Sequence, residues 1–102
     1  MFRTVLRQGM IDVPITYEIR DENNNLATLS GYDSVRLYIE GYSSSYLTAT
    51  VNSAGNVTVT FPTEIMADKS VKKAYFVATD NTNTDFIPIG EVGEIVVKGT
   101  WE

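Results

Sequence analysis

In the stretch VPITYEIR at residues 13–20 every second side chain is apolar and its neighbours are mostly polar or charged, and SVRLYIE at residues 34–40 repeats the pattern. Successive side chains of a β-strand point to opposite faces, so each stretch places its apolar residues on one face. The two stretches therefore predict strands that bury one face and expose the other. These two stretches indicate an all-β fold.

Other runs extend the same pattern. LTATV at 47–51 and VTVTF at 57–61 alternate apolar residues with threonine and predict a hairpin across residues 52–56. AYFVA at 74–78 and EIVVK at 94–98 are more continuously apolar, which is typical of strands covered on both faces. Further strands are expected at residues 2–8 and around residues 85–89.

Turn-forming clusters separate these runs at intervals of roughly ten residues, which is typical of an all-β sandwich. The segment PTEIMAD at 62–68 opens with a proline and is long enough for a short helix or turn that crosses between sheets. We expect a single domain over residues 1–102, built as an antiparallel β-sandwich of about seven or eight strands.

The inward set follows from the alternation, and a carboxylate placed in it, such as Leu37→Asp, is expected to unfold the domain. The predicted core comprises Val13, Ile15, Tyr17, Ile19, Leu29, Val35, Leu37, Ile39, Leu47, Val51, Val57, Val59, Phe61, Phe76, Ile95 and Val97.

Composition argues against several functions. The chain has neither cysteine nor histidine, which removes thiolate chemistry and the side chain most used for proton transfer and metal binding near neutral pH. A net charge of −5 opposes binding to nucleic acid. The chain has no apolar window long enough for a membrane helix and no signal-peptide core at its N-terminus. We expect a protein that is not an enzyme, with no cofactor, no metal and no membrane or nucleic-acid partner.

The strongest alternative to that expectation is the loop DENNN at 21–25, which begins like a calcium site. Leu26 stands where the glycine of a calcium loop belongs, however, and Tyr32 where the bidentate glutamate belongs. Short polar side chains of this kind also suit a hairpin turn. We interpret the segment as a turn.

Several segments resemble the N-terminal immunoglobulin-like domain of phage upper baseplate proteins. The similarity rests on IRDEN at 19–23, NLATLSGYDSVRL at 25–37, AGNVTVTFP at 54–62, KAYFVA at 73–78 and a final strand. The resemblance implies an immunoglobulin-like sandwich in the virion tail, assembled in the host cytoplasm. It implies docking to the tail hub or neighbouring baseplate subunits, with homo-oligomers in the assembly. A head decoration, neck or tail-fibre attachment domain fits the same segments.

Tyrosine and arginine suggest where such docking occurs, because both are enriched at the centres of protein interfaces. The candidate interface residues are Arg3, Arg7, Tyr32, Tyr38, Tyr42 and Tyr46. The first strand is the expected sheet edge, where unpaired backbone groups can accept a partner. A competing hypothesis is a carbohydrate-binding module that uses Tyr32, Tyr42, Tyr46 and Trp101 as its aromatic platform.

Overall fold

The computed structural model describes residues 2–20, 23–26, 34–53, 55–79 and 86–100, and these form seven strands and one 3₁₀ helix. The strands are β1 (Phe2–Arg7), β2 (Val13–Glu18), β3 (Ser34–Ile39), β4 (Tyr46–Ser53), β5 (Asn56–Phe61), β6 (Ser70–Thr79) and β7 (Phe86–Lys98). The helix η1 (Thr63–Met66) joins β5 to β6.

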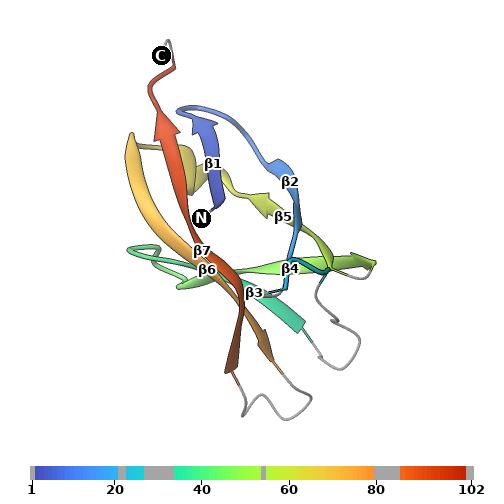
Figure 1. Cartoon of the computed structure of the whole chain (residues 1–102). Coiled ribbons are helices and arrows are strands. Elements are labelled where there is room, and N and C mark those ends of the chain that lie inside the picture. The colour runs from blue at the N-terminus through green and yellow to red at the C-terminus, as the bar shows by residue number, and fades with distance from the viewer. Residues whose placement is uncertain (1, 21–22, 27–33, 54, 80–85, 101–102) are drawn as a thin grey trace.

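All seven strands belong to one curled sheet in the order β1-β7-β6-β3-β4-β5-β2 (Figure 1). The strand β4 takes part in both halves of the curl, since residues 46–49 pair with β3 and the following residues pair with β5. The curl brings β1 and β2, which lie at opposite ends of the strand order, close to each other. The two halves therefore enclose a common core.

Two sequence expectations need correction. The sheet is mixed rather than wholly antiparallel, because β1 runs parallel to β7. A parallel pair needs a long connection, and here almost the whole chain separates the two strands. The strands expected around 85–89 and at 94–98 are a single strand, because β7 passes through a register shift opposite residues 74–76 and continues along β6.

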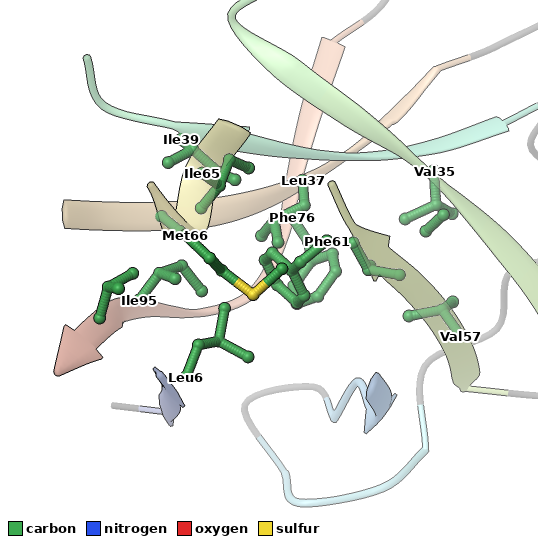
Figure 2. Packing of buried hydrophobic residues seen from close by; sticks show 14 of the residues in the cluster. Leu6, Val35, Leu37, Ile39, Val57, Phe61, Ile65, Met66, Phe76 and Ile95 are labelled. Carbon is green, nitrogen blue, oxygen red and sulfur yellow. The ribbon is translucent and has the colours of Figure 1, made fainter. Parts of the chain in front are cut away.

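The core is a single cluster of buried apolar side chains drawn from both halves of the sheet and from η1 (Figure 2). Leu37 is 0% exposed, as the alternating pattern predicts. The other predicted core residues that the structure places among the buried ones are Ile19, Val35, Ile39, Val57, Val59, Phe61, Phe76, Ile95 and Val97.

The remaining core predictions divide into three groups. Half-buried positions that pack against the cluster are Val13, Ile15, Tyr17 and Leu47. Val51 is 44% exposed, so its assignment to the core is wrong. Val51 points to the same face as its partner Val57. The pairing of β4 with β3 stops at the Val35–Ala49 pair, however, so β3 does not extend alongside Val51. Leu29 lies outside the described residues.

The expected crossover at 62–68 is confirmed as η1. The helix connects β5 to β6 and also contributes side chains to the core. Pro62 precedes the helix with extended backbone, and its carbonyl accepts a hydrogen bond from the Ile65 amide at 3.1 Å. Ile65 and Met66 are buried, and Figure 2 shows the Met66 side chain reaching between Leu6 and Phe61. The helix closes one end of the core, which the alternating pattern did not predict.

Candidate interaction surface

Three tyrosines form a row across neighbouring strands on the outer side of the sheet, away from the core. Tyr38 on β3 lies opposite Tyr46 on β4 and opposite Tyr75 on β6. The Tyr38 ring centroid is 5.3 Å from that of Tyr46 and 5.6 Å from that of Tyr75, and the second pair is stacked with only 11° between the ring planes. We call Tyr38, Tyr46 and Tyr75 the tyrosine row.

Arg36 fixes one end of this row. Its guanidinium carbon lies 4.4 Å from the centroid of the Tyr46 ring, within the range of a cation–π interaction. It also donates a long hydrogen bond, 3.5 Å, to the Tyr38 hydroxyl. Cross-strand aromatic pairs and a stacked arginine restrict the rotamers of all four side chains, so the row is ordered before any partner binds.

The arrangement of the rings bears on the carbohydrate hypothesis. Sugar platforms present ring faces to the ligand, whereas Tyr38 has Tyr46 on one side and Tyr75 on the other. Arg36 in turn covers a face of Tyr46. The rings are therefore stacked or tilted against one another and do not lie side by side in one plane, as the aromatic platform of a sugar site would.

Tyr42, another predicted interface residue, has a structural role of its own. It packs against the core cluster and donates a hydrogen bond of 2.7 Å to Glu64 Oε1 in η1. This hydrogen bond, with some desolvation, raises the pKa of the Tyr42 phenol. Tyr42 thus links the β3–β4 turn to η1 and is not part of the tyrosine row.

The predicted arginines Arg3 and Arg7 lie exposed on β1, and their side chains point outward because Thr4 and Leu6 point inward. Arg3 is in register with Glu94 of β7, and Arg7 with Lys98. Strand β1 is an end strand, which confirms the prediction that it forms a sheet edge. The docking of a partner along that edge stays a prediction.

Strand β1 also helps to close the core. The Thr4 hydroxyl and the Tyr17 hydroxyl of β2 are 2.5 Å apart, and the Phe2 ring contacts the Tyr17 and Phe76 rings at 5.4 and 5.6 Å. Burial raises the pKa of Tyr17 to about 12, although the hydrogen bond with Thr4 opposes that shift. We call Phe2, Thr4 and Tyr17 the seam.

A glycine makes room for the seam. A Cβ atom added to Gly93 of β7 would collide with the Phe2 ring. Deleting residues 1–8 would therefore remove part of the core as well as the edge, so point substitutions are the proper test of docking along β1.

Among the side chains that the structure describes, no group of three or more acidic residues is placed to hold a metal ion. In the calcium-like loop at 21–25, Asp21 and Glu22 lie outside the described residues, as do Tyr32 and Trp101. In the part of the chain that is described, no helix is both long and apolar enough to cross a membrane.

Of the six predicted interface residues, the structure brings Tyr38 and Tyr46 together and places Arg3 and Arg7 on the same outer side of the sheet. Tyr75 and Arg36 were not among the interface residues predicted from the sequence. The signal for Tyr75 was available, because it alternates with the inward residues Ala74 and Phe76, but the run AYFVA read as uniformly apolar.

Several solved protein chains are similar in structure to this one. The fold is similar to the solved N-terminal domain of phage TP901-1 ORF48, with a TM-score of 0.74 and 12% sequence identity. The match covers 95% of this chain and 85% of the other. No protein-family model and no curated protein sequence matches the chain significantly. The similarity establishes a shared fold for two very different sequences.

Proposed function

We propose that this protein is a non-enzymatic structural module of a phage tail baseplate, which docks a baseplate component to the tail hub or to neighbouring subunits. The observation that carries the proposal is the fold match to a phage protein domain over 95% of the chain. The sequence segments described above resemble phage upper baseplate domains independently of that match. The proposal places the protein in the virion tail, in contact with other virion proteins and with further copies of itself.

We also propose that the fold is immunoglobulin-like. Its support is the change of partner along β4, whose first half pairs with β3 and whose second half pairs with β5. A strand that passes from one layer to the other is a known way to join two packed sheets. The irregular register between Val51 and Ser53 lies in the same strand and is consistent with such a bend.

Electron microscopy tests the proposed function directly. Gold-labelled antibodies against this chain should decorate one region of the tail on purified phage particles from cells that carry the gene. Mass spectrometry of the same particles should detect the chain in a fixed ratio to other tail proteins. Particles that lack the chain, or labelling of the head alone, would contradict the baseplate assignment.

A further inference from the structure

The basic residues of this acidic protein are gathered on one side of the sheet. The chain carries 13 acidic and 8 basic residues, yet five of the eight basic ones point outward from β1, β7, β6 and β3. These five are Arg3, Arg7, Arg36, Lys73 and Lys98. Their direction follows from the inward residues between them, such as Leu6, Leu37, Ala74 and Val97, which belong to the core.

Acidic residues are sparse on the same side. Among the outward side chains described for these strands, Glu94 is the only carboxylate, and Glu40 stands at the border, directly after β3. No ion pair joins Arg3, Arg7, Lys73 or Lys98 to another described residue. We call this side, with its cations and the tyrosine row, the outer face.

Apolar and aromatic side chains lie between the cations. Val5 and Val71, on either side of Val96 in the register, are 49% and 63% exposed. Tyr75 of the tyrosine row is 43% exposed and lies two residues from Lys73 on β6. Exposed valines and tyrosines with cations around them have the composition of a protein interface, in which aromatic residues and arginine are enriched.

We propose that the outer face is the docking surface of the module and that its partner is an acidic protein surface. This inference rests on the proposed function and names the partner's chemistry. Charge complementarity argues for it, because Arg3, Arg7, Lys73 and Lys98 outnumber Glu94, the one described carboxylate in register with Arg3 and Lys73, and an excess of cations attracts carboxylates and orients the encounter. A nucleic acid fits less well, because the net charge of −5 repels a polyanion outside this one face.

The test is an NMR titration at low salt and neutral pH, with short poly-L-glutamate as the probe for an acidic polypeptide. The amide signals of Arg3, Lys73, Tyr38 and Tyr75 should shift, and added salt should reverse the shifts. Reversing two charges, in the variant Arg3→Glu with Lys73→Glu, should weaken binding by about tenfold or more. The substitution Tyr75→Ala should weaken it less.

A matched variant controls for net charge. The single reversal Arg20→Glu makes the same change in charge as Lys73→Glu alone, at an exposed position that follows β2, where it breaks the ion pair with Glu18. Arg20→Glu should keep most of the affinity, whereas Lys73→Glu should lose part of it. An equal loss in the two single variants would overturn the proposal, as would the absence of any shift with wild-type protein. Tighter binding of a DNA duplex to the same residues would assign the face to a phosphate polymer instead.

Two further outcomes are decisive. Concentration-dependent sedimentation without any polymer, abolished by the same charge reversals, would show that a second copy of this chain covers the face and would overturn the acidic-partner proposal. A failed titration would not affect the gold labelling of virions, which does not depend on any particular face. The docking surface and the baseplate assignment can therefore fail separately.

Discussion

The outer face and the opposite half of the sheet, formed by β5 and β2, differ in how their solvent-facing polar side chains are paired. On β5 and β2 the outward side chains form hydrogen bonds with their neighbours. The Thr16 and Thr58 hydroxyls are 3.0 Å apart, and Asn52 of the adjoining β4 donates a hydrogen bond of 2.7 Å to the Thr58 hydroxyl. On the outer face four of the cations, Arg3, Arg7, Lys73 and Lys98, form no ion pair with another described residue, and exposed valines lie among them. A surface that satisfies its own polar groups has less to gain from a partner, so the difference points to the outer face as the functional one.

The outer face and the opposite half pack on the same core, so a charge placed in that core should unfold the whole domain. Leu37 is 0% exposed directly beneath the outer face, so Leu37→Asp would bury an unpaired carboxylate. The cost is several kcal/mol against a total stability of about 5 to 15 kcal/mol. Circular dichroism should show an unfolded protein. A folded Leu37→Asp variant would show that the register of β3 is wrong.

The second prediction concerns the packing of β1 against β7, which supports the outer face and depends on Gly93. A methyl group there would meet the Phe2 ring, so Gly93→Ala should displace β1 from the seam and destabilise the protein by about 1 to 3 kcal/mol. Urea unfolding measures the change. Gly41→Ala provides a control for added volume, because nothing lies within 4 Å of a Cβ at Gly41, although its positive φ of 77° adds backbone strain. Equal stability of Gly93→Ala and wild type would refute the packing of Phe2 on β7.

The third prediction concerns pH at the seam. The pKa of Tyr17 is raised to about 12, whereas an unfolded tyrosine titrates near 10, so the unfolded state loses its proton first. The stabilisation is fully present below about pH 10 and is lost as the pH rises toward 12. We expect about 1 to 2 kcal/mol, discounted for partial exposure. Denaturant unfolding between pH 9 and 12 should show this fall, and Tyr17→Phe should remove it. An unchanged alkaline slope in Tyr17→Phe would contradict the burial of that hydroxyl.

The smallest expected stability changes come from one substitution on the outer face and one on the opposite half of the sheet. Tyr38→Ala removes the centre of the tyrosine row and should cost about 1 kcal/mol, since cross-strand aromatic pairs contribute about 0.5 to 1.5 kcal/mol. Thr16→Ala on the opposite half should cost about 0.5 kcal/mol through its exposed hydrogen bond. Thermal unfolding checks both values. Only Tyr38→Ala should also weaken the binding of poly-L-glutamate, and an equal binding loss in Thr16→Ala would erase the distinction between the faces.

Much of the fold could be predicted from the sequence because period-two burial is a local property. The apolar residues of the runs around Leu37 and Val59 were placed correctly, since every second residue of each run is an aliphatic or aromatic side chain that lies buried. Pro62 marked the crossover for a similarly local reason. Val51 was assigned wrongly because its exposure depends on where the pairing of β4 with β3 stops, at the Val35–Ala49 pair, which no residue near Val51 encodes.

The candidate surface was less predictable, because it depends on which strands are neighbours. Tyr38 and Tyr46 were identified as candidates from their positions in the sequence, but their stacking with Tyr75 requires β6 to lie beside β3. The gathering of Arg3, Lys73 and Lys98 likewise depends on the pairing of β1 and β6 with β7. A parallel pair between the first and last strands leaves no short-range signal in the sequence.

Zero-length cross-linking of purified tails, with mass spectrometry of the products, tests the central claim most directly. A carbodiimide joins amines to carboxylates in contact, so Lys73 and Lys98 should form bonds to aspartate or glutamate of a neighbouring tail protein. Lys72, which alternates with Val71 and Lys73 and therefore lies on the other side of β6, provides the internal comparison. Cross-links to a neighbouring protein from Lys72 alone, with Lys73 and Lys98 unmodified by any partner, would contradict the assignment of the outer face as the docking surface.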